Sequence, residues 1–215
     1  MITTGLGDRL EELRRGRSRV LEKGHAVVLG WSDQVFTEVG EMVLSQAGRV
    51  RGAVVVLADR DSAVMASAAA AHCVLVLPGN DDAADAEVVR GLLALRALLG
   101  ASAGPPVVAP MRDERFLTAA WLAAGTRGVV LDVESTTARL LVQAARHPGL
   151  ARALRDLLDL TGAEFHVVDA PDALGLTFAE ISRRYEDACA VGYLAADGRA
   201  LLTPASSERC GPGDR

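Results

Sequence analysis

The segment from His25 to Asp61 constrains the fold of this chain most strongly. An apolar run over Ala26–Leu29 stops at Gly30, an amphipathic segment follows, and a second apolar run over Ala53–Leu57 ends beside Asp59. Short apolar runs on either side of a segment with helical periodicity indicate a strand, a tight turn, a helix and a second strand. We therefore expect a β-α-β unit with a ligand crevice near Gly30 and Asp59.

Strands and helices continue to alternate after this unit, which predicts a parallel sheet with helices on both faces. A β-α-β unit with an acid at the end of its second strand is typical of a Rossmann-like, nucleotide-binding fold. Only residues 60–72 separate that strand from the next apolar run, Cys73–Leu77, where a regular Rossmann half has roughly 30 residues more. We predict an α/β, Rossmann-like sheet shortened by about one strand-helix unit, with a two-turn helix over Met65–Ala71 in the short connection.

Four parts are expected along the chain. They are a connector helix (1–23), a Rossmann-like domain (24–146), a linker helix (147–162) and a small, incomplete C-terminal subdomain of mixed α+β character (163–215). In the last part, the alternation over Glu164–Val168 predicts a strand, Leu176–Tyr185 predicts a short helix, and Asp197-Gly198 predicts the turn of a hairpin.

Composition excludes several classes of protein. The net charge is -5, with acids and bases interspersed, which argues against a nucleic-acid surface of the usual basic kind. Three cysteines stand at Cys73, Cys189 and Cys210 without a CxxC spacing, which fits a reducing cytoplasm and argues against a zinc site. No apolar run approaches the roughly 20 residues that span a bilayer, so we expect the chain as given to be soluble.

The first candidate site lies at the turn after the first predicted strand. The turn reads GWSDQV from Gly30, so it keeps only the first glycine of the GxGxxG dinucleotide fingerprint. Gly30 and Ser32 either form a structural turn or present backbone N–H groups to an anion. Trp31 either packs or stacks on a base. Asp59 either caps the next turn or binds ribose hydroxyls, with Arg60 contacting other groups of the ligand.

A second candidate site is the acidic cluster of Asp81, Asp82 and Asp85. Capping of the following helix explains these side chains, and a divalent cation such as Ca²⁺ is the alternative, because hard cations favour clustered carboxylates. The sequence contains no Ser-His-Asp arrangement and no general acid/base pair that would indicate catalysis.

Several segments resemble the cytoplasmic gating domain of Castor/Pollux-type ion channels, which belongs to the class that regulates potassium conductance. The pattern GHxxxLGWS, found at Gly24–Ser32, is the most specific. The resemblance rests on Ile2–Ser18, Gly24–Phe36, Val54–Asp61, Asp81–Val89, Gln143–Leu150 and Ala196–Pro204.

The resemblance implies a non-catalytic, ligand-sensing domain on the cytoplasmic face of the membrane. It further implies a homo-oligomer, assembled as a tetrameric ring, and a pore segment N-terminal to Ile2. The ligand is not specified, and a nucleotide or Ca²⁺ is expected. Relatives carry another strand and helix between Asp61 and Cys73 and continue past Arg215, so we interpret the chain as a truncated relative. The alternatives are a Rossmann-type, nucleotide-dependent oxidoreductase and a remnant without function.

Overall fold

A computed structural model of the chain describes residues 24–32, 35–45, 53–57, 66–100, 104–159, 162 and 164–215. The chain divides into two compact units, residues 1–162 and 163–215, and each is considered by itself. The connector helix expected within residues 1–23 lies outside the described residues.

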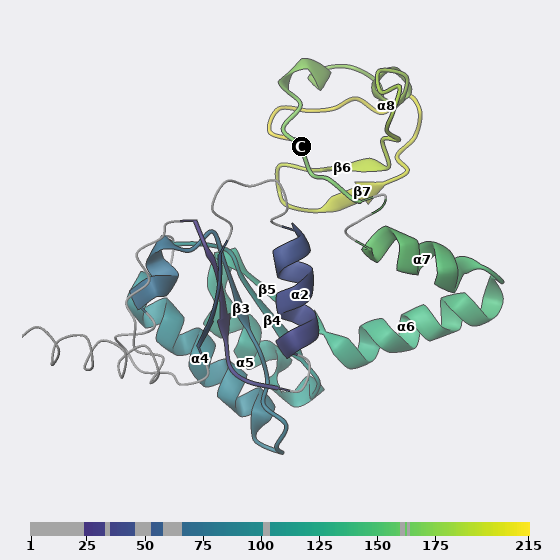
Figure 1. The fold of residues 1–215 in the computed structure, drawn as a ribbon. Coiled ribbons are helices and arrows are strands. Elements are labelled where there is room, and N and C mark those ends of the chain that lie inside the picture. The colour runs from purple at the N-terminus through teal and green to yellow at the C-terminus, as the bar shows by residue number, and fades with distance from the viewer. Residues whose placement is uncertain are drawn as a thin grey trace, which may run out of the picture. The chain divides into compact units, whose positions relative to one another are not determined.

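The first unit is built on a parallel sheet of five strands in the order β2-β1-β3-β4-β5 (Figure 1). β1 lies between two neighbours, with Ala26 opposite Val54 on one side and Cys73 on the other. This arrangement confirms the predicted α/β, Rossmann-like fold. The strands are β1 (Ala26–Leu29), β2 (Val54–Leu57), β3 (Cys73–Val76), β4 (Val107–Met111) and β5 (Gly128–Asp132).

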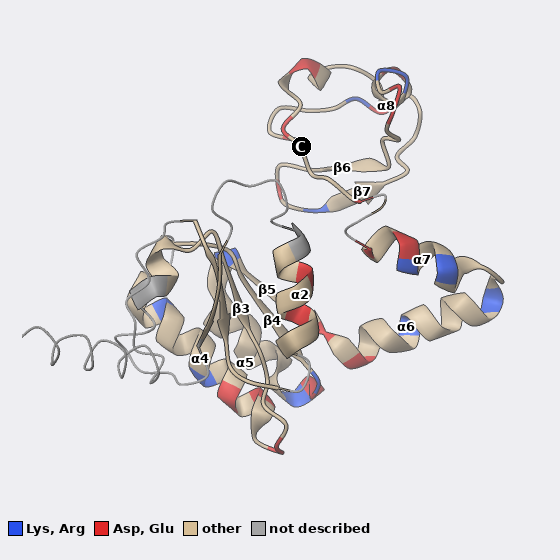
Figure 2. Ribbon diagram, viewed as in Figure 1, with Lys and Arg blue, Asp and Glu red and all other residues tan. Residues whose placement is uncertain are grey.

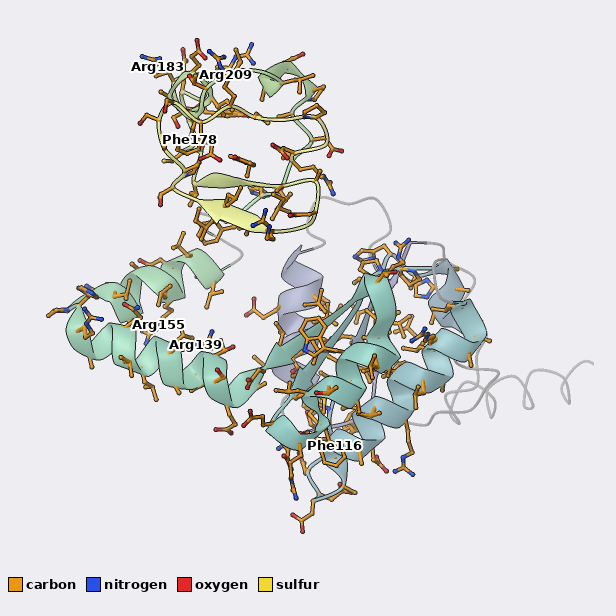
Figure 3. The ribbon with its side chains drawn as sticks, turned by 180° about the vertical axis from the view of Figure 1, so that it is seen from behind. Phe116, Arg139, Arg155, Phe178, Arg183 and Arg209 are labelled. Carbon is orange, nitrogen blue, oxygen red and sulfur yellow. The ribbon has the colours of Figure 1, made fainter. Side chains whose placement is uncertain are left out.

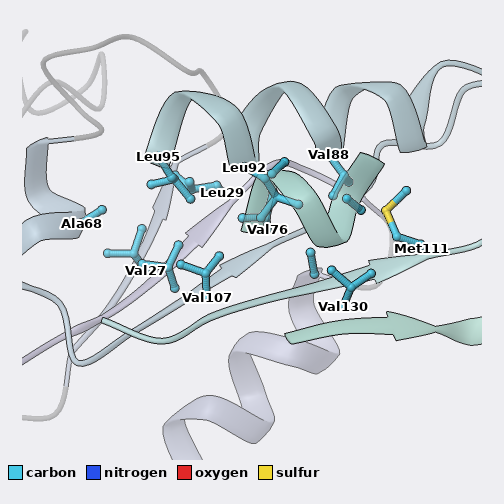
Figure 4. Close-up of a cluster of buried hydrophobic side chains, with 14 residues drawn as sticks. Val27, Leu29, Ala68, Val76, Val88, Leu92, Leu95, Val107, Met111 and Val130 are labelled. Carbon is cyan, nitrogen blue, oxygen red and sulfur yellow. The ribbon is translucent and has the colours of Figure 1, made fainter. Parts of the chain in front are cut away.

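Helices cover both faces of this sheet, as predicted. Helix α2 (Val35–Ser45) packs on one face through Val35, which joins Val28 and Leu77 in a small buried cluster. Helices α4 (Ala84–Leu99) and α5 (Glu114–Ala124) pack on the other face. There a larger cluster of aliphatic side chains is almost completely buried (Figure 4); it includes Val27, Leu29, Val76, Val88, Leu92, Leu95, Val107 and Met111.

The connection between β2 and β3 differs from the prediction. A helix is present where a two-turn helix was expected over Met65–Ala71, but in the described part it is a 3₁₀ helix, η1 (Ala66–Ala70). The N–H of His72 already donates to the carbonyl of His25 at 2.8 Å, so the chain has joined β1 two residues after η1. A short connection that must reach the sheet this soon favours the tighter 3₁₀ geometry.

Two helices follow the sheet and pack against each other. They are α6 (Val133–Arg146) and α7 (Leu150–Leu158), and neither contains a buried side chain. Asp132 caps α6 by accepting the N–H of Ser135 at 2.9 Å, and Gly149, in the left-handed conformation, precedes α7. The linker helix predicted within residues 147–162 is therefore α7.

The second unit contains a two-stranded antiparallel sheet, β6 (Gly192–Leu194) and β7 (Ala200–Leu202), a 3₁₀ helix, η3 (Pro171–Ala173), and a short helix, α8 (Phe178–Ser182). The hairpin turn predicted at Asp197-Gly198 is confirmed, because Gly198 takes a φ of 84° between the two strands. Tyr193 donates its hydroxyl to Glu208 at 2.8 Å, and this hydrogen bond raises the pKa of Tyr193 to about 12.

The strand predicted over Glu164–Val168 is wrong. These residues form neither helix nor strand, and Phe165 and Val167 are exposed. Alternation of apolar and polar residues favours an extended chain, but a strand also needs a neighbour that pairs with it. The described part of this unit does not supply one.

Leu92 and Leu93 of α4 provide a matched test of the core. Leu92 is 2% exposed and Leu93 is 52% exposed. We expect Leu92→Ala to lower the free energy of unfolding by about 2–5 kcal/mol, because it leaves a cavity between α4 and the sheet. Leu93→Ala should change it by less than about 0.5 kcal/mol. Urea denaturation of the full chain measures both, and equal losses would contradict this packing.

Candidate functional site

The connections of the sheet define a topological switch point between β1 and β3. From β1 the chain crosses to β2 on one side, and it then returns past β1 to β3 on the other side. Ligands of open α/β sheets bind at such a point, beyond the carboxyl ends of the strands. Gly30 follows β1 at this edge and Leu77 follows β3.

Gly30 is required there by the packing of the two strand ends. Its φ is +109°, and a Cβ at this position would lie 2.5 Å from the carbonyl oxygen of Leu77. The N–H of Leu77 also donates to the carbonyl of Leu29 at 2.7 Å. In a complete GxGxxG fingerprint, a glycine allows the pyrophosphate to approach the backbone closely. Here the carbonyl of Leu77 makes the close approach to Gly30 instead.

The next residues of the turn differ in exposure. Trp31 is 52% exposed, whereas Ser32 is 7% exposed and its carbonyl accepts the N–H of Val35 at 3.1 Å, which begins α2. Phe36, 74% exposed, contacts Trp31 edge to face, with ring centroids 5.6 Å apart. An exposed aromatic pair at the carboxyl edge of a sheet offers a stacking surface to a planar ligand.

Phe36 is a residue that sequence reasoning missed. It lies next to Val35, which is buried, and so points away from the apolar stripe of α2. A large aromatic residue off the buried stripe and five positions after Trp31 was the available signal. On the same helix, burial raises the pKa of the Glu38 carboxyl above its ordinary value.

The other predicted ligand residues of this site, Asp59 and Arg60, lie outside the described residues. Their contacts with a ribose or another group of a ligand stay predictions.

The acidic cluster is not gathered around one point. Asp85 is buried, and one of its oxygens accepts the N–H groups of Arg112 at 2.9 Å and Asp113 at 2.6 Å. Asp81 instead accepts the N–H of Ala83 at 3.1 Å, and Asp82 is exposed. In the described ranges, no group of three His, Cys, Asp or Glu side chains is arranged to hold a metal ion.

Asp85 has a structural role that the sequence did not reveal. It holds the segment after β4 against the start of α4, and Arg112 donates to the carbonyl of Gly79, after β3, at 2.7 Å. Asp113, which also caps α5, is paired with Arg115, and the hydrogen bonds from Arg115 lower the pKa of the Asp113 carboxyl. The hydrogen bonds of Asp85 and of the Arg112 side chain join residues far apart in sequence, so no local pattern indicates them.

Gly30→Ala tests the close approach of the two strand ends. We expect a loss of more than about 2 kcal/mol of stability, because the new methyl group meets backbone atoms and the φ is strained. Gly40→Ala is the control: Gly40 lies in α2 with open space around its Cβ position, and the change should stabilise the helix by up to about 1 kcal/mol. Thermal unfolding of both variants checks the opposite signs, and equal effects would contradict the turn geometry.

Comparison with known proteins relates the chain to one family of channels. Residues 134–215 match the family described as Castor and Pollux, part of voltage-gated ion channel. The chain is 28% identical to the probable ion channel POLLUX of Arabidopsis thaliana, with all of this chain and 30% of that protein covered. It is 26% identical to the probable ion channel CASTOR of Oryza sativa subsp. japonica, covering 95% of this chain and 27% of that protein.

Among solved structures, the GsuK channel aligns with 95% of this chain and 38% of its own, at a TM-score of 0.45 and 19% identity. The GsuK channel bound to NAD covers 92% of this chain and 36% of its own, at a TM-score of 0.44 and 19% identity. The chain spans less than a third of the length of the curated relatives named above. Within the described residues, no helix is long and apolar enough to cross a membrane. The sequence comparisons show that the chain is similar to the Castor and Pollux ion channels.

Proposed function

We propose that this chain is a non-catalytic, ligand-sensing regulatory domain of a Castor/Pollux-like cation channel, located at the cytoplasmic face of the membrane. The observation that carries the proposal is the exposed pair of Trp31 and Phe36 at the switch point of the sheet. The curated relatives support the channel context, because they are named as ion channels. A pore segment is the partner that this function requires.

The ligand that this site favours is a nucleotide. The ring of Trp31 would stack on the base, and Asp59 and Arg60 would contact the sugar and other polar groups. Ca²⁺ at Asp81, Asp82 and Asp85 has less support, because Asp85 already accepts two backbone N–H groups and lies beside the Arg112 guanidinium.

Self-association is the second part of the proposal, and the hairpin of α6 and α7 supports it. Leu140 and Leu141 of α6 and Leu158 of α7 are exposed and line an apolar groove that reaches Glu41 of α2. α6 carries few charges along its length (Figure 2). A helix pair without a buried side chain gains little stability by itself, because most helical stability comes from packing an apolar face. A second copy of the chain would cover this groove and build a ring.

The proposed ligand site and the proposed assembly surface adjoin the same edge of the sheet. α6 begins directly after Asp132, the last residue of β5. Because the strands are parallel, β5 ends at the same edge of the sheet as the turn of Gly30. A ligand that binds one arrangement of the ring more tightly shifts the population towards it. Ligand binding at the turn of Gly30 would thus change how the hairpin of α6 and α7 contacts neighbouring subunits.

The ligand proposal is tested by thermal unfolding of the full chain with NAD, NADH, NADPH, ATP, AMP, Ca²⁺, Mg²⁺ and K⁺. We expect one nucleotide to raise the midpoint with increasing dose, as ligands that bind the folded state do. Trp31→Ala should abolish this shift and leave the ligand-free midpoint within a few degrees, because the ring is half exposed. A response to cations alone, or a nucleotide response unchanged in Trp31→Ala, would contradict the site.

Two adjacent exposed residues of α6 test the assembly. Leu141, 66% exposed, lines the groove, and Val142, 59% exposed, does not. We expect Leu141→Glu to weaken self-association at least about tenfold, because it buries a charge in an apolar contact, and Val142→Glu to change it little. Sedimentation equilibrium measures both. A monomeric parent chain, or a larger effect of Val142→Glu, would overturn the groove as the interface.

A further inference from the structure

A cysteine and a histidine are paired at the amino-terminal end of β3, at the opposite edge of the sheet from the turn of Gly30. The Sγ atom of Cys73 lies 3.3 Å from Nε2 of His72. The other ring nitrogen of His72, Nδ1, lies 3.0 Å from the carbonyl oxygen of Gly24. Cys73 is half-buried within the sheet beside Ala26 of β1.

The hydrogen bonds of His72 determine its tautomer. A carbonyl oxygen only accepts, so Nδ1 carries the hydrogen and donates it to Gly24. In the neutral ring Nε2 is then the unprotonated nitrogen, and it accepts the thiol proton of Cys73. A nucleophile within reach of a base, and a base oriented by a third group, is the arrangement that activates cysteine nucleophiles.

η1 and β4, which flank β3, contain no titratable side chain. β1 is preceded by His25, whose carbonyl accepts the backbone N–H of His72 at 2.8 Å. The His72 ring is thus held between the carbonyl of Gly24 and the sulfur of Cys73.

The other two cysteines lack this arrangement and serve as internal references. Cys189 is exposed, and its thiol points to the carbonyl of Ala190 at 3.8 Å. Cys210 is buried, and burial raises the pKa of its thiol. Exposure alone would make Cys189 the most reactive of the three.

We propose that Cys73, paired with His72, is an activated thiol that exchanges with low-molecular-weight disulfides. His72 takes the thiol proton, and the Cys73 thiolate attacks one sulfur of the disulfide. A new S–S bond joins Cys73 to that sulfur, the original S–S bond breaks, and the second sulfur leaves as a thiolate, which takes the proton. Cys73 is oxidised and the departing thiol is reduced.

The modification would act on the centre of the sheet. β3 pairs with both β1 and β4, and the bond from His72 to Gly24 connects β3 to the segment entering β1. An adduct on the half-buried Cys73 sulfur would displace the His72 ring, which makes the bond to Gly24. We therefore expect the mixed disulfide to lower the thermal midpoint of the chain. The site lies at the other edge of the sheet from the proposed nucleotide site and does not depend on it.

Competitive alkylation of the full chain tests the proposal. Substoichiometric iodoacetamide at about pH 6.5 should label Cys73 at least about tenfold faster than Cys189, as quantified by mass spectrometry of the peptides. As the pH rises, the alkylation rate of Cys189 should increase by a larger factor than that of Cys73. Oxidised glutathione should then form its mixed disulfide at Cys73 first. Slower labelling of Cys73 than of Cys189 at this pH would overturn the proposal, and this comparison needs no variant.

The variant His72→Gln provides the second measurement, because glutamine can still donate to Gly24 but cannot become a cation. It should reduce the alkylation rate of Cys73 about tenfold at about pH 6.5 and leave the rate of Cys189 unchanged in the same sample. Near-ultraviolet circular dichroism of Trp31 and Trp121 confirms that the first unit remains folded. An unchanged Cys73 rate in the folded variant would show that His72 does not activate the thiol.

Discussion

The close approach of β1 and β3 at their carboxyl ends is the constraint on which the rest of this structure depends. The carbonyl of Leu77 occupies the space that a side chain at position 30 would need, so only glycine permits the strands to end side by side. That contact fixes the register of the central strands, on which α2 packs from one face and α4 from the other. It also directs Trp31 outward, because the chain must turn at once into α2.

The sequence predicts well what is encoded locally. Short-range patterns predict strands in the apolar runs Ala26–Leu29 and Cys73–Leu77 and a turn at Asp197-Gly198. The structure has β1 and β3 in these two runs and the hairpin turn between β6 and β7. The strand expected over Glu164–Val168 is wrong because strand formation depends on a partner elsewhere in the chain. The local pattern predicts a cap or a metal ligand at Asp85 for the same reason, since its partners Arg112 and Asp113 come from the segment after β4.

The packing at Gly30 also gives a physical reason why this turn keeps only the first glycine of the GxGxxG fingerprint. The carbonyl of Leu77 occupies the space beside Gly30 into which a phosphate would otherwise fit. Ser32, the next residue but one, is buried in the turn. Recognition at this edge would depend more on the exposed aromatic faces than on the backbone.

In the proposed assembly, the exposed hairpin of α6 and α7 would make association and folding parts of one equilibrium. Because neither helix contains a buried residue, a second copy that covered their exposed apolar side chains would add to their stability. Binding between copies adds stability that grows with concentration, whereas the core around Leu92 is independent of concentration. In the proposed assembly, the sheet would persist while the hairpin gains or loses its partner, which is the property that a regulatory domain needs in order to transmit a signal without unfolding.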